Sequence, residues 1–381
     1  MAGGGPRRRV DQQRGGDHRQ RTPVYDWGYS GRFGDEINWG NAIVLVPAIL
    51  EQLYGDSALM GAYYDRMVRF VDYIQRQKAQ GFIVDAALGD WVGDEPTSGR
   101  ITGTWGYYLT AQAMARAATL TGHTADVAKY EKLAADIKTA FNEAFFNESL
   151  GRYTATGNAG TGGATQTAQA LALDAGLAPE DKRGTVLDAL VELVYAYHPN
   201  GTGPHLSGGT IGMGPIVRVL MHGDRDDVLW ETLQQNDQPS YGYFMASTPA
   251  NPGGMTTIGE RWNRGDSKNH MILAQIEEWF HAGLAGIQLT KDGLLFKPKP
   301  VGDLTRASGT YEDRQGTARS SWTKKDGRFA LSVTVPANTT AEVWAPAGSK
   351  ASARATFQRA DGGYAVFTVP AGTHHFTASA K

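Results

Sequence analysis

Residues 42–74 read AIVLVPAILEQLYGDSALMGAYYDRMVRFVDYI, and this stretch decides the fold class. Apolar side chains recur at helical spacing up to Tyr54, where Gly55-Asp56 provides a glycine stop followed by a polar restart. A second apolar stripe then continues at the same spacing to Ile74. Periodic apolar positions on both sides of a glycine stop predict two amphipathic helices that form an antiparallel hairpin.

The same order of helix, short glycine turn and helix repeats along the chain. Residues 111–120 are followed by Thr121-Gly122-His123 and by a second periodic segment that reaches Phe141. Further candidate helices are 166–174, 186–197, 211–221, 228–235 and 271–283. Short turns alternate with long glycine-rich loops, which is typical of a toroid of helical hairpins, with a helical bundle as the alternative. A ring of six hairpins needs about twelve helices at usual lengths, and about nine are predicted, so we expect an (α/α)6 barrel incomplete at its N-terminus.

The character of the sequence changes near Gly286. Short β-branched or aromatic runs separated by Gly, Pro, Asn and Asp occur at 294–296, 328–335, 340–344, 355–357 and 364–369. Lys325-Asp326-Gly327 and Ala360-Asp361-Gly362 predict hairpin turns, and residues 335–338 and 369–372 predict strand ends. This part is therefore predicted to be a small all-β sandwich that packs on the helical domain.

The chain divides into three regions on these grounds: a disordered lead-in at 1–25, an (α/α)6-barrel catalytic-type domain at 26–287 and a β-sandwich at 288–381. The lead-in is rich in Gly, Arg and Gln and has no apolar core of a signal peptide. Its run Arg7-Arg8-Arg9 has two alternative readings, a nucleic-acid arm or an export signal, but no hydrophobic stretch follows it promptly.

Composition excludes several classes of protein. The formal net charge of −2 gives no electrostatic reason to expect a nucleic acid or an anionic membrane as partner. The chain has no cysteine, which excludes disulfides and thiolate zinc sites and leaves cytosol and periplasm both open. No run of about eighteen apolar residues occurs, so no transmembrane helix is predicted. The charge balance favours a neutral or small partner, and neither localisation nor oligomeric state follows from the composition.

Aromatic residues in loops carry the first functional signal. Trp39, Trp91 and Trp262 lie in glycine-rich stretches outside the periodic segments. A pyranose ring has an apolar C–H face that stacks on an aromatic plane, while its hydroxyls require carboxylates and amides around the edge. These residues therefore suggest a sugar-binding cleft, although each Trp is also an ordinary core residue.

The stretch 255–263, MTTIGERWN, holds Glu260 between two Thr, an Arg and a Trp, without helical periodicity. Glycoside hydrolysis with inversion uses two carboxyl groups roughly 6.5–9.5 Å apart, so that a water molecule fits below the sugar. Glu260 suits the general base in such a pair. The alternative is a glutamate that merely forms a salt bridge with Arg261 or another cation.

A second loop, residues 87–97, gathers three carboxylates and a Trp before a helix expected near Thr104. Asp90 is predicted to bind sugar hydroxyls beside Trp91, whereas the carboxylates at 94 and 95 are expected to cap or solvate a turn. His270 opens a helix, where it either binds a sugar hydroxyl or caps the helix.

Other chemistries lack their motifs. The sequence has no Walker loop, no dinucleotide fingerprint after a strand, no H-E-x-x-H and no zinc-ligand spacing. We therefore predict no metal and no cofactor.

Four groups of motifs follow one another along the chain: Trp39-Gly40-Asn41-Ala42 with Val46-Pro47 and Tyr54-Gly55-Asp56, then Gly89-Asp90-Trp91, Pro239-Ser240-Tyr241-Gly242-Tyr243, and Thr256 to Trp262. In these motifs and their order, the chain resembles the bacterial α-L-rhamnosidases of glycoside hydrolase family 78 over nearly all of residues 27–380. The resemblance implies an (α/α)6 barrel followed by a β-sandwich. It also implies that Glu260 is the general base of an inverting mechanism, that Trp39 and Trp91 receive the methyl side of rhamnose, and that His270 binds a hydroxyl.

The chain departs from the family pattern in three places. Asn41 stands where the family usually has Asp, and Gly259 where it usually has Trp. The acidic segment that carries the general acid in the family has no proper match before Trp39, and Glu36 is not promoted to that role. We therefore expect an N-terminal truncation.

Three functions follow as alternatives. The first is an inverting α-L-rhamnosidase that releases terminal rhamnose. The second is a polysaccharide lyase on the same barrel, in which a Tyr or His abstracts a proton next to a uronate carboxylate. The third is a non-catalytic remnant that retains sugar binding.

Overall fold

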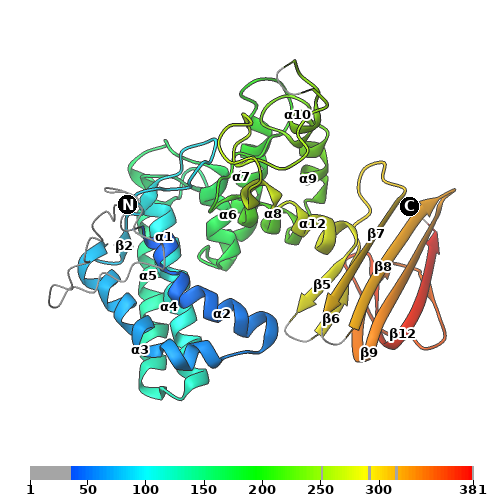
Figure 1. Ribbon diagram of the computed structural model, residues 1–381, viewed down its shortest axis with the longest axis horizontal. Helices are drawn as coiled ribbons and strands as arrows, with labels where there is room; N and C mark the ends of the chain where they lie inside the picture. The colour runs from blue at the N-terminus through cyan, green and yellow to red at the C-terminus, as the bar shows by residue number, and fades with distance from the viewer. Residues whose placement is uncertain (1–35, 250–251, 291–292, 314–315, 380–381) are drawn as a thin grey trace, which may run out of the picture.

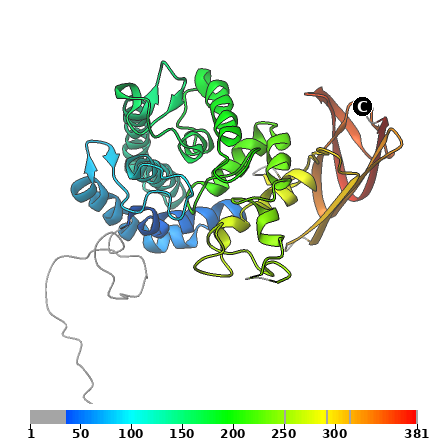
Figure 2. The ribbon, with the colours of Figure 1, turned by 90° about the horizontal axis from the view of Figure 1, so that it is seen from above.

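The computed structural model describes residues 36–249, 252–290, 293–313 and 316–379 (Figure 1). A helical part comes first and a β domain follows beside it, as Figures 1 and 2 both show. The predicted lead-in at 1–25 lies outside the described residues. No helix in the described part of the chain is long and apolar enough to span a membrane.

Four helical hairpins form most of the helical part. In each, two consecutive helices pack on one another. The first hairpin matches the prediction, because α2 ends at Gly55, whose φ of 67° is left-handed and whose N–H bonds to the Glu51 carbonyl. The hairpins are α2 (Ala42–Tyr54) with α3 (Ala58–Tyr73), α4 (Gly99–Thr121) with α5 (Thr124–Phe145), α6 (Gln166–Asp174) with α7 (Arg183–Ala196), and α8 (Met213–His222) with α9 (Asp226–Leu233).

One helix of each hairpin belongs to an inner arc. The packed neighbours run in the order α2, α4, α6, α8 and α12 (Glu277–Trp279). Within this arc, every residue of α6 from Gln166 to Leu173 is buried, whereas α2 buries only Val44 and Pro47. The helix predicted at 271–283 is present in three pieces, α11 (Met271–Ala274), α12 and the π-helix η5 (Phe280–Leu284).

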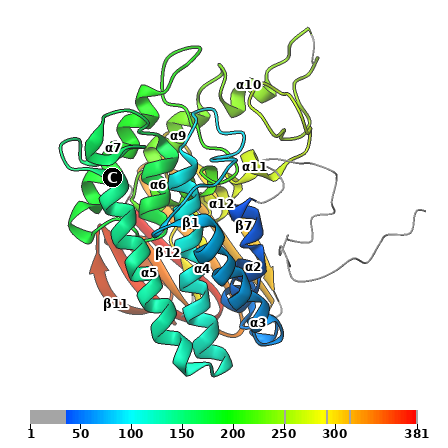
Figure 3. The ribbon, with the colours of Figure 1, turned by 90° about the vertical axis from the view of Figure 1, so that its left-hand side faces the viewer.

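Short elements occupy the loops between the long helices. They are α1 (Ile37–Gly40), η2 (Ile74–Lys78), β1 (Ala79–Gln80), β2 (Ile83–Val84), β3 (Phe146–Asn147), β4 (Arg152–Tyr153), η3 (Gly157–Ala159), η4 (Glu180–Lys182) and α10 (Tyr241–Met245). Figures 1 and 3 place α10 and its loops at the opposite end of the helical part from α3.

Helix α4 begins earlier than the sequence predicted, at Gly99 rather than near Thr104. Ser98 caps it, accepting from the Arg100 N–H at 3.3 Å. Its first turns contain glycines that weaken helix propensity but permit close packing, since a Cβ on Gly103 would lie 2.6 Å from the Val84 carbonyl. Tertiary packing here outweighs local propensity.

The β domain is one eight-stranded sheet folded around a single core. Its strands are β5 (Ile287–Thr290), β6 (Gly293–Phe296), β7 (Arg306–Asp313), β8 (Gly316–Lys325), β9 (Arg328–Pro346), β10 (Lys350–Ala351), β11 (Thr356–Asp361) and β12 (Tyr364–Ser379). The first half of β9 pairs with β8, and its second half pairs in parallel with β6. Trp322 and Phe296 belong to the same core although they lie on different halves of the sheet.

The predicted strand ends at 335–338 and 369–372 are wrong. Both segments lie inside long strands and face one another, with Pro370 opposite Thr340 and Gly372 opposite Val335. The register shifts between these pairs, and Asn338 has a φ of 59°. A bulge of this kind tolerates Pro and bends a strand without ending it, so β9 and β12 serve both halves of the sheet.

Candidate active site

The 255–270 loop contains Glu260, and hydrogen bonds between its first half and its second half hold it in place. The Glu260 N–H donates to the Ser267 carbonyl at 2.9 Å, and the His270 N–H donates to the Ile258 carbonyl at 2.9 Å. The Thr257 hydroxyl donates to the Lys268 carbonyl further along the same pair of segments. These bonds fix the backbone on both sides of the Glu260 carboxylate.

The Glu260 side chain is half-buried and held as a carboxylate. The Ser267 N–H donates to its Oε2 at 3.2 Å. Burial raises the pKa of Glu260, but hydrogen bonds from the Ser267 hydroxyl and N–H and from the Trp91 side chain oppose this rise, and the pKa is lowered below its ordinary value. Glu260 is therefore ionised at neutral pH, which is the state that a general base requires.

Trp91 reaches Glu260 from the other predicted loop, residues 87–97. Its side chain hydrogen-bonds the Glu260 carboxylate. The Arg261 guanidinium lies over the same indole ring, 5.9 Å from its centroid. The structure thus brings together two segments that are far apart in the sequence and places the indole ring of Trp91 beside Glu260.

Asp90 lies behind Trp91 and is buried, with 6 % of its surface exposed. Its Oδ2 accepts from the Thr167 hydroxyl at 2.7 Å and from the Gly209 N–H at 2.8 Å. Its Oδ1 accepts from the N–H groups of Ile211 at 2.9 Å and Gly212 at 3.0 Å. Burial raises the pKa of Asp90, and these four donors oppose that rise. Its oxygens are occupied by protein donors, so in the structure Asp90 anchors the loop, and its predicted contact with sugar hydroxyls stays a prediction.

Close packing at this anchor requires glycine. A Cβ on Gly212 would lie 2.0 Å from the Thr167 hydroxyl oxygen and 2.6 Å from the Asp90 carboxylate. The neighbouring Thr210 belongs to the same framework, because its N–H donates to the Trp91 carbonyl at 2.8 Å and its hydroxyl donates to it at 3.0 Å.

His270 caps helix α11. Its Nδ1 accepts from the Ile272 N–H at 3.2 Å. In a neutral ring this assigns the proton to Nε2. Within the described part of the chain no hydrogen bond to Nε2 occurs, so capping and hydroxyl binding are compatible roles for the two nitrogens of one ring.

Trp262 is a core residue with 3 % of its surface exposed. It stacks on Phe244 with centroids 5.3 Å apart and meets the edge of Tyr241 at 5.0 Å. Its ring is covered on these sides, so the structure places it behind the wall of the site rather than in it. Substrate binding by Trp262 stays a prediction without a contact that supports it.

Trp39 lies in α1 and is half-buried. No hydrogen bond or ring contact among the described residues joins Trp39 to the group around Glu260. Glu36, just before it, is buried and bonds the backbone N–H groups of Asn38 at 3.2 Å and Leu88 at 3.1 Å. Burial raises the pKa of Glu36. This carboxylate ties α1 to the 87–97 loop, a positioning role that no local sequence pattern indicates.

The other carboxylates of the 87–97 loop are also engaged. Asp94 accepts from the Tyr197 hydroxyl at 2.6 Å, and Glu95 accepts from the Ser207 hydroxyl at 2.6 Å. Burial raises the pKa of Glu95. The described carboxylates of this loop thus bind protein groups, and none of them is set apart as a partner acid for Glu260.

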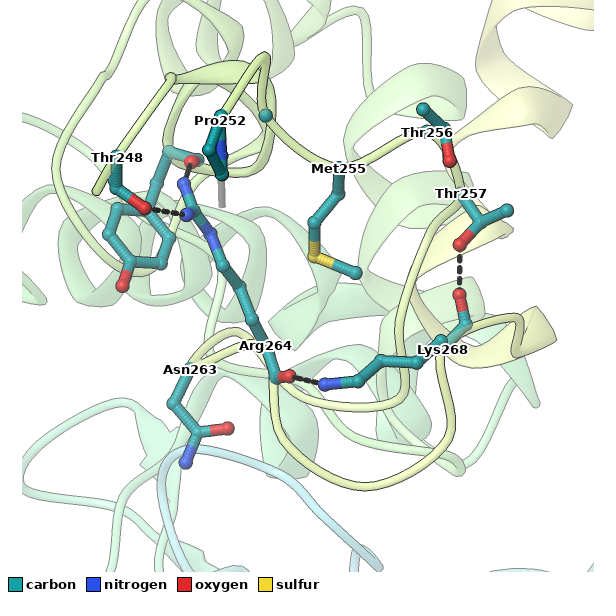
Figure 4. Close-up of a pocket in the computed structure, with 10 residues that line it drawn as sticks. Thr248, Pro252, Met255, Thr256, Thr257, Asn263, Arg264 and Lys268 are labelled. Atoms are coloured by element: carbon teal, nitrogen blue, oxygen red, sulfur yellow. Dashed lines mark hydrogen bonds between the residues drawn. The ribbon is translucent and has the colours of Figure 1, made fainter. Parts of the chain in front are cut away.

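A cavity of about 820 Å³ adjoins the 255–270 loop (Figure 4). Arg264 crosses it and bonds the carbonyls of Tyr243 and Ala246 and the Thr248 hydroxyl. Lys268 lines the same cavity and bonds the Arg264 carbonyl. In Figure 4 Met255 points into the space between them. Both cations donate hydrogen bonds to backbone carbonyls, and these bonds help to hold the 255–270 loop that contains Glu260.

The described part of the chain contains no cluster of side chains suited to bind a metal ion. No group of three or more His, Asp or Glu side chains there could hold a metal ion.

Comparison with known proteins identifies the family. The bacterial alpha-L-rhamnosidase six-hairpin glycosidase domain matches residues 8–284, and the bacterial alpha-L-rhamnosidase C-terminal domain matches residues 286–359. An alpha-L-rhamnosidase of Streptomyces avermitilis is 33% identical over 91% of this chain, and one of an Alteromonas species is 29% identical over 81%. The chain spans about a third of the length of these curated relatives, 33% and 34%.

Solved structures agree with this assignment. The Streptomyces avermitilis alpha-L-rhamnosidase complexed with L-rhamnose has a TM-score of 0.78 and 30% identity, and covers 92% of this chain and 34% of its own. The alpha-L-rhamnosidase from Dictyoglumus thermophilum has a TM-score of 0.76 and 26% identity, and covers 90% of this chain and 40% of its own. The chain therefore belongs to the bacterial alpha-L-rhamnosidase six-hairpin glycosidase family.

Proposed function

We propose that this chain forms the part of an α-L-rhamnosidase active site that contains the general base. The observation that carries the proposal is the Glu260 carboxylate, which hydrogen bonds from Ser267 and Trp91 keep ionised. A relative with 33% identity is named an alpha-L-rhamnosidase, and a structural neighbour with 30% identity was solved with L-rhamnose.

The proposed reaction is hydrolysis with inversion. Glu260 accepts a proton from a water molecule while the water oxygen forms a bond to the anomeric carbon of rhamnose. The glycosidic bond breaks on the opposite face, and a second carboxyl group donates a proton to the leaving oxygen. Trp91 supplies an apolar plane for the sugar, and the Nε2–H of His270 donates to a sugar hydroxyl.

Turnover of p-nitrophenyl α-L-rhamnoside tests this directly. Wild type and Glu260→Gln are compared, with Glu143→Gln as a control because Glu143 is an exposed glutamate on α5. Loss of the base is expected to lower the rate by about 10²–10⁴-fold, whereas the control retains the wild-type rate. Proton NMR of the first product is expected to show the β anomer, and an α anomer formed first would contradict inversion.

A second candidate function is sugar binding without hydrolysis by this chain. It is supported by Asp90, Asp94 and Glu95, which bind protein groups and leave Glu260 without a partner acid among the described carboxylates of the 87–97 loop. Calorimetry with L-rhamnose separates the two: saturable binding that Trp91→Ala weakens, together with no turnover by a folded chain, supports binding alone.

A lyase reaction receives no support from this site. The Tyr241 hydroxyl, next to the site wall, donates to the Leu273 carbonyl at 2.5 Å. Burial raises the pKa of Tyr241 well above its ordinary value, so it is a poor base at neutral pH.

A further inference from the structure

The cavity beside the 255–270 loop carries an excess of positive charge. It has a volume of about 820 Å³ and is lined by Arg264 and Lys268, and the described residues that line it include no Asp or Glu. The nearby Asp266 forms an ion pair with Arg261 instead. Figure 4 shows the side chains of both lining cations at this cavity. Two positive charges therefore share one cavity, and no carboxylate among its described lining residues balances them.

The contacts of Arg264 orient its guanidinium without neutralising it. Its Nη1 donates to the Thr248 hydroxyl at 3.2 Å, and its Nη2 donates to the carbonyls of Tyr243 and Ala246. The Tyr243 ring centroid lies 4.3 Å from the guanidinium carbon. The Nε–H is buried and has no acceptor among the described residues. All of these partners are uncharged, and a partly buried cation of this kind favours an anionic ligand.

Lys268 brings the second charge to the cavity and is held by the same loop. Its Nζ donates to the Arg264 carbonyl, and its own carbonyl accepts from the Thr257 hydroxyl. An ammonium group has three N–H donors, so this bond leaves donors for a ligand. Lys268 also follows Ser267, whose N–H bonds the Glu260 carboxylate. A ligand held by Lys268 therefore lies against the loop that contains the candidate base.

The rest of the cavity suits a sugar better than a single inorganic ion. Thr256, Thr257 and Asn263 line it with hydroxyl and amide groups, and Met255 and Tyr243 line it with apolar surface. Pockets for small molecules measure about 300–1,000 Å³, whereas a water molecule occupies about 30 Å³. A volume of about 820 Å³ falls in the first range. Hydrogen-bonding groups beside apolar surface match the hydroxyls and the C–H face of a pyranose.

We propose that this cavity binds an acidic saccharide, a sugar that carries a carboxylate or a sulfate ester. Arg264 and Lys268 donate charge-assisted hydrogen bonds to the oxygens of the anionic group. Thr257 and Asn263 bond the ring hydroxyls, and Met255 contacts the apolar face of the ring. The inference concerns binding, and its test does not require hydrolysis by this chain.

Calorimetry on the full chain at low ionic strength tests the proposal with four probes. D-glucuronate and D-glucose 6-sulfate carry the two kinds of anionic group, D-glucose is their neutral analogue, and inorganic sulfate is the anion without a sugar. We expect at least one charged sugar to bind about tenfold more tightly than glucose and than inorganic sulfate. The tighter of the two charged sugars identifies the anionic group. Added salt is expected to weaken this binding, because it screens the two cations.

Two variants and a matched control assign the binding to this cavity. Arg264→Gln and Lys268→Gln are each expected to weaken binding of the charged sugar about tenfold. Lys129→Gln is the control, because Lys129 is an exposed lysine on α5, and it is expected to leave the affinity unchanged. Arg264 also braces residues 243–248, so circular dichroism checks the fold of its variant. Lys268 is exposed, and its replacement is expected to change stability little.

Four outcomes would overturn the proposal. Neither charged sugar binds, or glucose binds as tightly as both of them. Inorganic sulfate binds as tightly as the charged sugars, which would assign the cavity to a free ion. Lys268→Gln, with an unchanged circular dichroism spectrum, binds the charged sugar as tightly as wild type.

Discussion

The 87–97 loop and the 255–270 loop each contain a carboxylate close to a Trp, but they bury different members of the pair. In the first loop the carboxylate of Asp90 is buried and Trp91 faces the candidate base. In the second loop Trp262 is buried and the carboxylate of Glu260 faces the site. A carboxylate close to a Trp therefore does not by itself reveal which of the two side chains meets the substrate.

The difference follows from what each loop packs against. Asp90 lies opposite four donors from Thr167 and the 209–212 backbone, which compensate a buried carboxylate. Trp262 lies against Phe244 and Tyr241, whose rings cover the apolar part of its indole. Each loop therefore buries the side chain that finds suitable contacts in the protein behind it, Asp90 in one loop and Trp262 in the other. The other side chain of each pair, Trp91 or Glu260, lies on the side of the site.

The largest effect on stability is expected from Asp90→Ala. Removing the carboxylate leaves four donors without their acceptor at a buried site, which is expected to lower the free energy of unfolding by about 4 kcal/mol. Urea unfolding measures it. Asp94→Ala is the control, since Asp94 is exposed and bonds the Tyr197 hydroxyl, and it is expected to cost less than about 1 kcal/mol. Equal losses in the two variants would remove the distinction between anchor and surface carboxylate.

The next largest effect comes from a comparison of the two Trp residues, in stability and in rhamnose binding. Trp262→Leu is expected to cost about 3 kcal/mol of stability, because it empties part of a packed core, whereas Trp91→Leu is expected to cost less than about 1 kcal/mol. Binding of L-rhamnose should show the reverse order, with roughly tenfold weaker binding for Trp91→Leu. Chemical denaturation and calorimetry on the same two variants check both halves. A stronger binding defect in Trp262→Leu would show that the buried indole also contributes to the site.

Glu260→Gln is expected to change stability by less than about 0.5 kcal/mol at neutral pH. The sign is set by the lowered pKa of Glu260 in the folded chain, relative to its ordinary value of 4.5. A lowered pKa contributes stability that is present above pH 4.5 and is lost as the pH falls through the folded value. The variant is thus slightly less stable than wild type at pH 7, and this difference disappears in acid, as unfolding measured across pH would show. A difference that grew on acidification would reverse the assigned shift.

The smallest effect concerns the hydroxyl that bonds Glu260. Ser267→Ala removes the side-chain bond but keeps the Ser267 N–H, so the pKa of Glu260 is expected to rise. Where turnover is observed, the acid limb of its pH profile moves to higher pH. Ser207→Ala is the matched control, because its hydroxyl bonds Glu95 in the other loop. A shift of the same size in both variants would argue that Glu260 is not the group that sets the acid limb.

Much of the fold was predictable from local pattern. The glycine stops at 55 and 122 end α2 and α4 as predicted, because a left-handed residue after a helix favours glycine. The prediction of α6 at 166–174 matches its bounds. The hairpin of β7 and β8 was missed, since Arg306–Asp313 is polar and contains a glycine. Its pairing with β8, which itself pairs with β9, makes it a strand.

Non-local geometry accounts for what the sequence did not predict. Pro336 and Pro370 favour strand ends when only the neighbouring residues are considered. Their strands nevertheless continue, because both prolines lie at the bulge where the pairing of β9 with β12 shifts register. The order of residues also gave no sign that Glu36 ties α1 to Leu88, 52 positions along the chain.

The sequence by itself determined the hairpin architecture and the change from helices to strands near Gly286, because periodicity and composition are properties of neighbouring residues. It also singled out Glu260 as a candidate base, a role that stays a prediction. Only the tertiary structure decided that Asp90 is an anchor and that Trp262 belongs to the core. The donors that hold Asp90 include Gly209, 119 residues away. Burial and hydrogen-bond compensation are set by such distant partners, which the chain brings together only on folding.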